Sequence, residues 1–500
     1  MTYALLLTAF VISTCGLVYE LIAGTIASYL LGDSVTQFSI VIGVYLFAMG
    51  IGSFLSRYIE KNLVLTFVQI ELLVGLIGGC SAATLFMLFE HVESFRILLY
   101  GIVGLIGILI GMEVPLLMRV LKDRLQFKDL VSQIFTFDYV GALIASILFP
   151  LVLVPVLGLV RSSFLFGLLN VLVAFWTIHL FRNELPWLRM MRSTAFILLV
   201  CLVCGFAFSE KLMAMAEAAT FSDNIIYSTS TPYQRIVLTG NGKDFRLFLN
   251  GNLQFSSRDE YRYHEALVHP AMASLNEPKQ ILVLGGGDGL AVRELLKYPS
   301  VEQITLVDLD KQMTDLFRQK GLLSRLNEES LNDPKVKIIN DDAFIWLRQK
   351  AGKYDFIVVD FPDPSNFSLG KLYSDTFYKA IKNVLNPQGL LVVQSTSPYY
   401  AKNSFWCVVN TLNSVGLHTT PYHAFVPSFG DWGYVIASFD PFKSGEQFPQ
   451  GLRYLSSETF SHMLHFSADM LPTVKLVNKL NNQSLVHMFE SEWSEYVDVH

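Results

Sequence analysis

Four acidic side chains in the downstream half of the chain each follow an apolar segment that is predicted to be a strand. These are Asp288, Asp308, Asp341 and Asp360, after the predicted strands 281–284, 303–308, 335–340 and 354–360. Strands that alternate with helices indicate a parallel, doubly wound sheet, whose ligands bind beyond the carboxyl ends of the strands. Converging carboxylates attract positive charge and repel phosphate. The pattern therefore predicts a site for a cationic ligand that also carries hydroxyl groups.

A glycine turn, Gly285-Gly286-Gly287-Asp288-Gly289, directly follows the first of these strands. Nucleoside ligands commonly bind at such a turn. A glycine-rich turn by itself is a weak signal, and the acid after the second strand, Asp308, by itself indicates only a binder of a ribose diol. The repetition of acids at neighbouring strand ends is the stronger indication of a ligand site.

The loop after the fourth strand, Asp360-Phe361-Pro362-Asp363-Pro364, carries two carboxylates three residues apart. Its two prolines restrict the backbone, so both carboxylates can face one cavity at low entropic cost. A carboxylate placed there could take a proton from an alkylammonium group. The alternative is a plain Asp-Pro surface turn, which the acidic strand ends around it disfavour.

The remaining elements of this half are predicted from periodicity and turn residues. Segments 234–239 and 245–250 alternate apolar and polar residues around Asn241-Gly242, which predicts a small antiparallel sheet. A further strand is expected at 389–394, and helices at 290–298, 311–319 and 375–385. The segment from Tyr261 to Glu265 fits an ordinary amphipathic helix with His264 in the core, and without further context that interpretation is favoured.

The upstream part of the chain is predicted to form a multi-pass α-helical membrane domain. Seven stretches approach or exceed the roughly 20 apolar residues that a membrane crossing needs, at 3–30, 36–56, 63–88, 97–118, 138–158, 163–181 and 194–209. The domains are therefore expected at 1–210 for the spans, 211–275 for the small β subdomain and 276–500 for the α/β doubly wound, Rossmann-like domain. The expected location is the cell (inner) membrane.

Glycines recur within the predicted spans and would let helix backbones approach closely. They are Gly43, Gly50, Gly52, Gly101, Gly104, Gly107 and Gly111. Lys and Arg concentrate in alternate loops, which the positive-inside rule places in the cytoplasm. Seven spans would then put the downstream half on the other side, although an enzyme that uses a nucleoside is expected in the cytosol. The side on which this half lies stays open.

Four carboxylates, Glu20, Glu71, Glu113 and Asp138, fall at or near apolar depth. A carboxylate in that position is costly unless it is paired or faces a polar cavity. Two interpretations are equally weighted: a polar path or small-cation site, and simple contacts that hold helices together.

Composition limits the class of partner. The chain has 52% hydrophobic and 16% charged residues, with a net charge of −6. A mildly acidic downstream half disfavours nucleic acid, whose affinity depends on Lys and Arg at phosphates. The five cysteines show neither a disulfide framework nor the spacing of a zinc site, so no metal is predicted.

The downstream motifs together resemble the polyamine aminopropyltransferase, or spermidine synthase, family. The resemblance covers about residues 225 to 465 and rests on six spaced motifs: Tyr233-Gln234, Asn250 to Gln254 with Arg258-Asp259-Glu260, Tyr263-His264-Glu265 with His269-Pro270, Gly285 to Gly289, Asp360 to Pro364 and Trp432-Gly433-Tyr434. The upstream half resembles the multi-span extensions of some bacterial, membrane-anchored members. The fold implied is a methyltransferase-type Rossmann-like domain.

This resemblance implies transfer of an aminopropyl group from decarboxylated S-adenosylmethionine to a diamine, usually putrescine, with release of 5′-methylthioadenosine. No permanently bound cofactor is implied, and a homodimer is expected because soluble members commonly dimerise. Asp360 would accept the proton. The amine would be held by His264, Asp288, Asp363, Tyr263 and Gln254. The nucleoside would contact Gln234, Gly285, Gly287, Asp308, Asp341 and Asp342, with Asp308 at the ribose and Asp341 near adenine.

The chain departs from the family pattern at three places: Leu290 replaces a glycine, Asp341-Asp342 an Asp-Gly, and Asn366-Phe367 a Gly-Pro. These changes bear on the adenine contacts and on the choice of amine. Two rival functions stay open. One is a methyltransferase that uses S-adenosylmethionine, and the other is a membrane transporter or sensor whose downstream domain binds polyamine or nucleoside without catalysis.

Overall fold

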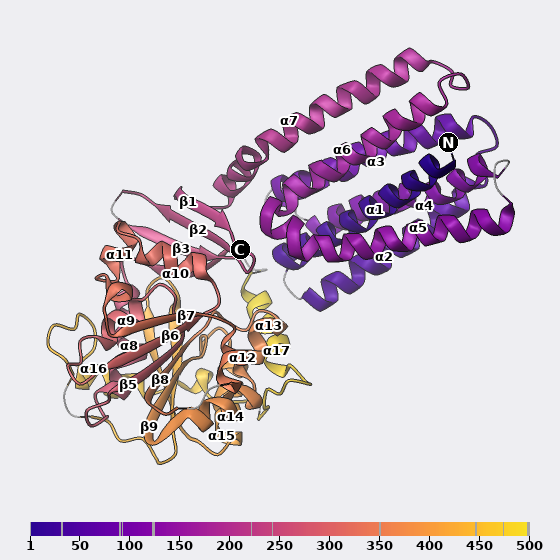
Figure 1. Ribbon diagram of the computed structural model, residues 1–500. Coiled ribbons are helices and arrows are strands. Elements are labelled where there is room, and N and C mark those ends of the chain that lie inside the picture. The colour runs from indigo at the N-terminus through magenta and orange to yellow at the C-terminus, as the bar shows by residue number, and fades with distance from the viewer. Residues whose placement is uncertain are drawn as a thin grey trace. The chain divides into compact units, whose positions relative to one another are not determined.

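The computed structural model describes residues 2–497 except 32–33, 90–91, 93, 123–125, 222, 243, 350–351, 446–447 and 474. Contacts divide the chain into two compact units, Met1–Asn224 and Ile225–His500. The first is helical, and the second contains two sheets (Figure 1).

The first unit consists of long apolar helices. They are α1 (Thr2–Leu31), α2 (Ser34–Ser56), α3 (Leu63–Leu88), α4 (Phe95–Leu121), α5 (Phe127–Leu148), the π-helical η2 (Phe149–Leu157), α6 (Gly158–Leu180) and α7 (Leu188–Thr220). Helix α7 continues past residue 210, where the sequence suggested that the first domain would end.

Six helices among the described residues are long and apolar enough to cross a membrane, instead of the seven segments predicted. The difference arises because the predicted segments 138–158 and 163–181 lie on one helical stretch, Phe127–Leu180, of 54 residues. This stretch includes α5, η2 and α6. Between η2 and α6 the backbone of Gly158, with φ 73° and ψ 175°, departs from helical geometry. At about 1.5 Å per residue it is long enough for two crossings of a hydrocarbon core of about 30 Å.

Some of the predicted small residues bring helices of this unit into backbone contact. A Cβ added to Gly52 of α2 would lie 2.0 Å from the carbonyl oxygen of Ile108 on α4, and one on Gly111 of α4 would lie 2.2 Å from that of Met49. Gly107 of α4 lies against α2 in the same way. By contrast, an added Cβ would meet no described atom within 4 Å at Gly43, Gly50, Gly101 or Gly104. The prediction of close packing is therefore confirmed at α2 and α4 by three of the seven glycines.

The second unit begins with the predicted small antiparallel sheet. Its strands are β1 (Asn224–Ser230), β2 (Arg235–Gly240), β3 (Phe245–Leu249) and β4 (Asn252–Ser256), in that order across the sheet. The turn at Asn241 joins β2 to β3, as predicted, and α8 (Glu260–Met272) follows β4.

A larger sheet of seven strands has the order β10-β11-β9-β8-β5-β6-β7. Its strands are β5 (Gln280–Gly285), β6 (Gln303–Asp308), β7 (Val336–Asn340), β8 (Tyr354–Asp360), β9 (Leu385–Gln394), β10 (His418–Val426) and β11 (Gly430–Ser438). The five strands β5 to β9 are parallel, as predicted. Strands β10 and β11 are antiparallel because only residues 427–429 connect them, and a short hairpin reverses the chain.

Helices cover both faces of the larger sheet (Figure 1). The buried side chains of Ile281 and Val283 on β5 pack in one core with α8 and α9 (Leu290–Leu295). Leu282 and Leu284 of the same strand pack in the other core with α12 (Ala343–Arg348), α14 (Asp375–Val384) and α15 (Lys402–Ser414). Alternate residues of a strand face opposite sides, so both faces are apolar and the carboxyl ends of the strands are left to polar groups.

Candidate active site

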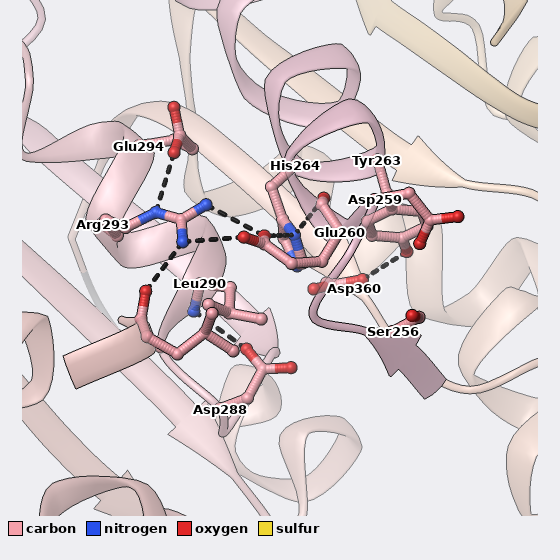
Figure 2. Close-up of polar contacts among 12 residues, drawn as sticks. Ser256, Asp259, Glu260, Tyr263, His264, Asp288, Leu290, Arg293, Glu294 and Asp360 are labelled. Carbon is pink, nitrogen blue, oxygen red and sulfur yellow. Dashed lines mark hydrogen bonds and ion pairs between the residues drawn. The ribbon is translucent and has the colours of Figure 1, made fainter. Parts of the chain in front are cut away.

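Asp360 lies at the carboxyl end of β8 and is held by a tyrosine from helix α8. The hydroxyl of Tyr263 donates a hydrogen bond of 2.6 Å to Oδ1 of Asp360 (Figure 2). Loss of hydration raises the pKa of Asp360 to about 6, although the hydrogen bond from Tyr263 and the nearby His264 oppose the shift. A carboxylate with a pKa near neutrality is suited to accept a proton and release it again.

The glycine turn lies directly against this carboxylate because β5 and β8 pair in parallel with Gly285 opposite Asp360. The amide of Gly286 donates to the carbonyl oxygen of Asp360 over 3.1 Å. Gly286 has φ 65°, and a Cβ there would lie 3.1 Å from Oδ2 of Asp360. Glycine at this position keeps the left-handed turn unstrained and the space beside the carboxylate open.

His264, one residue after Tyr263 on α8, is oriented by Glu260. Its Nδ1 lies 2.8 Å from the carbonyl oxygen and 2.9 Å from Oε2 of Glu260. Both neighbours are acceptors, so Nδ1 carries the hydrogen and Nε2 is left for other partners. Burial opposes protonation of the ring, but the hydrogen bond and the charge of Glu260 outweigh it, and the pKa of His264 is raised.

Glu260 is itself fixed by a buried arginine on α9. Arg293 donates to both carboxylate oxygens of Glu260, at 3.0 and 2.9 Å, and its Nε donates to Glu294 at 2.9 Å (Figure 2). Glu294 also lies 2.7 Å from Nε2 of His269. Sequence reasoning did not identify this network. Glu260 lies four residues before His264, a spacing that places both on one side of a helix and was available as a signal.

Asp288 is the fourth residue of the glycine turn and lies near His264. Its Oδ1 accepts from the amide of Leu290 at 2.9 Å (Figure 2). Burial raises the pKa of Asp288, and the charge of His264 partly offsets this. Asp288, Asp360 and His264 interact electrostatically, so the structure brings these three predicted residues together with Tyr263.

Asp308 ends β6 on the other side of the glycine turn. Its Oδ2 accepts from the amide of Gly287 at 3.1 Å and its Oδ1 from that of Asp310 at 2.9 Å. Burial raises the pKa of Asp308 to about 7. Gln234 reaches this group indirectly, since its Nε2 donates to Oδ2 of Asp310 at 3.0 Å. The predicted nucleoside residues Gly285, Gly287, Asp308 and Gln234 thus form one connected side of the site.

Asp363 lies on the loop three residues after Asp360. Burial raises its pKa to about 7. Its Oδ2 accepts from the hydroxyl of Thr396 at 3.4 Å, and its Oδ1 has no hydrogen-bond partner among the described residues. A buried oxygen that lacks a partner is costly unless a ligand supplies a donor. This carboxylate is therefore free to receive one.

A buried amide holds the loop between the two aspartates in place. Gln394 on β9 donates to the carbonyl oxygen of Phe361 and, at 2.7 Å, to the hydroxyl of Tyr373. Its own oxygen accepts from Nε1 of Trp432 at 3.2 Å. Sequence reasoning missed Gln394, and its position as the last residue of a buried strand at the carboxyl edge of the sheet was the only signal.

The three other predicted residues are less closely tied to the carboxylate cluster. The amide of Asp341 donates to the carbonyl oxygen of Asp308 at 3.2 Å, which places its backbone next to the end of β6. Asp342 caps α12 through Phe344 and pairs with Lys371 at 2.7 Å. Gln254 donates to the carbonyl oxygen of Asn252 at 3.2 Å, and no recorded hydrogen bond between described residues joins it to the aspartates.

Known proteins resemble the chain over its whole length. The model of the spermine/spermidine synthase domain matches residues 260–445. A polyamine aminopropyltransferase from Leptospira interrogans is 50% identical over 498 residues, which cover 100% of both chains. Polyamine aminopropyltransferase 2 from Ralstonia nicotianae is 53% identical over 498 residues, with 98% of both chains covered.

Among solved structures, a spermidine synthase from Thermotoga maritima aligns with a TM-score of 0.44 at 26% identity, covering 49% of this chain and 85% of that one. The two aminopropyltransferases align with 98–100% of this chain, which includes the helical first unit, at 50–53% identity. The chain belongs to the polyamine aminopropyltransferase, or spermidine synthase, family.

Proposed function

We propose that the second unit transfers an aminopropyl group from decarboxylated S-adenosylmethionine to putrescine, and that Asp360 accepts the proton of the attacking amine. The products are spermidine and 5′-methylthioadenosine. The observation that carries this proposal is the position of Asp360, against the glycine turn and hydrogen-bonded to Tyr263, with Asp288 and His264 beside it.

The charges of the site suit two cationic reactants. A protonated diamine and a sulfonium repel each other in water, and a set of carboxylates can attract both. In this proposal Asp363, Asp288 and His264 hold the amine, with Tyr263 and Gln254 at its edge. The nucleoside lies toward Asp308, Gln234 and the glycine turn, with Asp341 and Asp342 at the rim.

The chemical step needs no bound metal or cofactor for its balance. Asp360 removes a proton from the ammonium group, and the freed nitrogen forms a bond to the carbon beside the sulfonium. The carbon–sulfur bond breaks, its electrons neutralise the sulfur, and the nucleoside thioether leaves. General-base help of this kind contributes about 10²–10⁴-fold, and positioning of the two reactants contributes more.

The test is turnover by the purified full chain, with methylthioadenosine and spermidine as products. Asp360→Asn should lower kcat by about 10²–10⁴-fold without loss of fold. Asp315→Asn serves as the matched control and should leave kcat unchanged, because this half-buried carboxylate pairs with Lys311 on α10 (Lys311–Arg318) and makes no recognised contact with Asp360 among the described residues. Methylated product without aminopropyl transfer would favour the methyltransferase instead. Full activity of Asp360→Asn would refute the assigned proton acceptor.

We also propose that the first unit crosses the cell (inner) membrane. Large apolar side chains are exposed on its helices, for example Phe47 at 73%, Leu151 at 69% and Val156 at 69%. Such an apolar surface is typical of helices that face lipid. Sedimentation with membranes after alkaline carbonate washing tests this proposal, and light scattering in detergent tests the expected homodimer.

A further inference from the structure

Two carboxyl groups lie buried among the helices of the first unit. Glu71 on α3 and Glu113 on α4 are 0% and 1% exposed. None of their four carboxyl oxygens has a hydrogen-bond partner within the described part of the chain. Carboxylates are expensive in apolar surroundings and usually face a partner or a ligand.

A role in holding the helices together does not account for these two residues. Other polar groups of the same unit do make contacts between helices: the hydroxyl of Ser163 donates to the carbonyl oxygen of Gly78 at 2.6 Å, and that of Tyr45 donates to Gly16 at 2.8 Å. Glu71 and Glu113 make no such bond among the described residues. Their burial therefore requires another explanation.

A third unpartnered acceptor belongs to the same cluster. Asn170 on α6 is 1% exposed, and its Nδ2 donates to the hydroxyl of Tyr19 at 3.0 Å, while its Oδ1 has no partner in the described structure. Gly75 lies one turn after Glu71 on α3, and a Cβ there would be 3.4 Å from Cβ of Asn170. Asn170 thus packs on the side of α3 that carries Glu71.

Tyr19 and the two glutamates also lie near one another. A Cβ on Gly78 of α3 would be 2.6 Å from the ring of Tyr19, so this ring covers the same side of α3. The charges of Glu71 and Glu113 act on each other and on Tyr19. Tyr19 also lines a small cavity with Tyr45 and Glu20, which has room for about one water-sized group; Glu71, Glu113 and Asn170 are not among the residues that line it.

The unpartnered atoms define the chemistry of a ligand. The four oxygens of the two glutamates and Oδ1 of Asn170 are all acceptors when the carboxyl groups are ionised, so the ligand must bring positive charge and several donors. A primary ammonium group has three N–H donors and a size close to that of water. We propose that Glu71, Glu113 and Asn170 bind the ammonium group of an alkylamine, at a site in the first unit that is distinct from Asp360 and Asp363. The choice of an amine over an inorganic cation rests on the proposed function of the second unit.

The test is equilibrium binding of radiolabelled putrescine to the full chain in lipid nanodiscs. The double variant Glu71→Gln, Glu113→Gln should lose one equivalent of bound putrescine, because affinity at this site falls on the order of tenfold to a hundredfold. It should keep its aminopropyl transfer activity. Glu60→Gln, an exposed acid-to-amide change in the same unit, is the matched control and should bind as the wild type does.

Several outcomes would overturn the proposal. Unchanged putrescine stoichiometry in the double variant is one of them. Another is displacement of the bound putrescine by sodium chloride but not by butylamine when the ionic strength is the same. That result would indicate a site for an inorganic cation. If the double variant does not fold, Asn170→Leu, which is similar in volume, must weaken the same binding by about tenfold, and unchanged binding refutes the site. A chain that binds the amine at this site yet transfers no aminopropyl group would refute only the proposed function.

Discussion

The hydroxyl of Tyr263 and Oδ1 of Asp360 are 2.6 Å apart although 97 residues separate them along the chain. The contact joins helix α8, which follows the small sheet, to the carboxyl end of β8 in the large sheet. It stabilises the ionised carboxylate, so it acts against the loss of hydration that raises the pKa of Asp360 to about 6. This hydrogen bond thus helps to orient the carboxylate and, after burial, His264 and Asp288, contributes to its pKa.

Removal of this hydrogen bond should move the pH dependence of the rate. In Tyr263→Phe the pKa of Asp360 rises, because a donor to its charged form is lost. Asp360 must be ionised to act as a base, so the acid limb of kcat/KM should shift to higher pH by roughly one unit. Tyr399→Phe, at a partly exposed tyrosine, should leave the limb in place. A pH–rate profile from pH 5 to 9 measures the shift, and an unmoved limb would contradict the role of Tyr263.

Much of the site could be predicted because it depends on where strands end. The strands at 303–308 and 354–360 have the predicted bounds, since an apolar run stops at an aspartate in each case. The carboxyl ends of the parallel strands meet at one edge of the sheet, as predicted, and the pairing of β5 with β8 places Asp360 opposite Gly285. Local sequence carries this information because strand ends and turns are local features.

Other parts of the site depend on contacts between distant residues. Glu260 and Arg293 are 33 residues apart, and neither periodicity nor turn chemistry pairs them. Asp342 was predicted, with Asp341, to contact the nucleoside, and the structure adds two contacts that the sequence did not predict: its carboxylate caps α12 and pairs with Lys371. An aspartate that caps a helix looks like any other aspartate in sequence, so only the fold reveals these contacts. The hairpin of β10 and β11 was also missed, because Pro421 and several polar residues weaken the strand pattern of β10.

The raised pKa values of Asp360 and Asp363 predict that the active site destabilises the protein at neutral pH. The values are about 6 and about 7, against an ordinary value of 3.8. Between pH 4 and pH 7 the folded chain therefore binds more protons than the unfolded chain, so stability falls as the pH rises through this range. Asp360→Asn removes one such group and should raise Tm relative to wild type at pH 8 more than at pH 5. Thermal melting in detergent measures this, and the difference between pH 5 and pH 8 should be larger for Asp360→Asn than for the control variant Asp315→Asn.

The ion pair between Arg293 and Glu260 should be essential for folding of the second unit. Arg293 is 8% exposed, and Arg293→Met would remove the arginine that donates to both carboxylate oxygens of buried Glu260, while Glu294 would keep its ion pair with Lys297 at 2.6 Å. Loss of one partner of a buried pair costs about 3–5 kcal/mol. Arg325→Met, at an exposed arginine that donates to a backbone carbonyl, should change stability by about 0.5 kcal/mol or less. Chemical denaturation followed by tryptophan fluorescence compares the two variants, and equal stabilities would show that the network is dispensable.

The contact between Gly287 and Asp308 predicts a variant that separates binding of the two substrates. A Cβ on Gly287 would lie 2.6 Å from Oδ2 of Asp308, the oxygen that already accepts from the amide of Gly287. Gly287→Ala must therefore displace this carboxylate, which is proposed to hold the ribose. The KM for decarboxylated S-adenosylmethionine should rise about tenfold or more. The KM for putrescine should rise less, because Asp288 is the only proposed amine-binding residue in this turn, and Asp360 and Asp363 lie on another strand and loop. Gly321→Ala is the matched control, since its φ of 171° is accessible to alanine and its Cβ would be 4.0 Å from the nearest described neighbour. Equal increases in both KM values would instead indicate that the whole turn had collapsed, and the separation of an amine side from a nucleoside side would not hold.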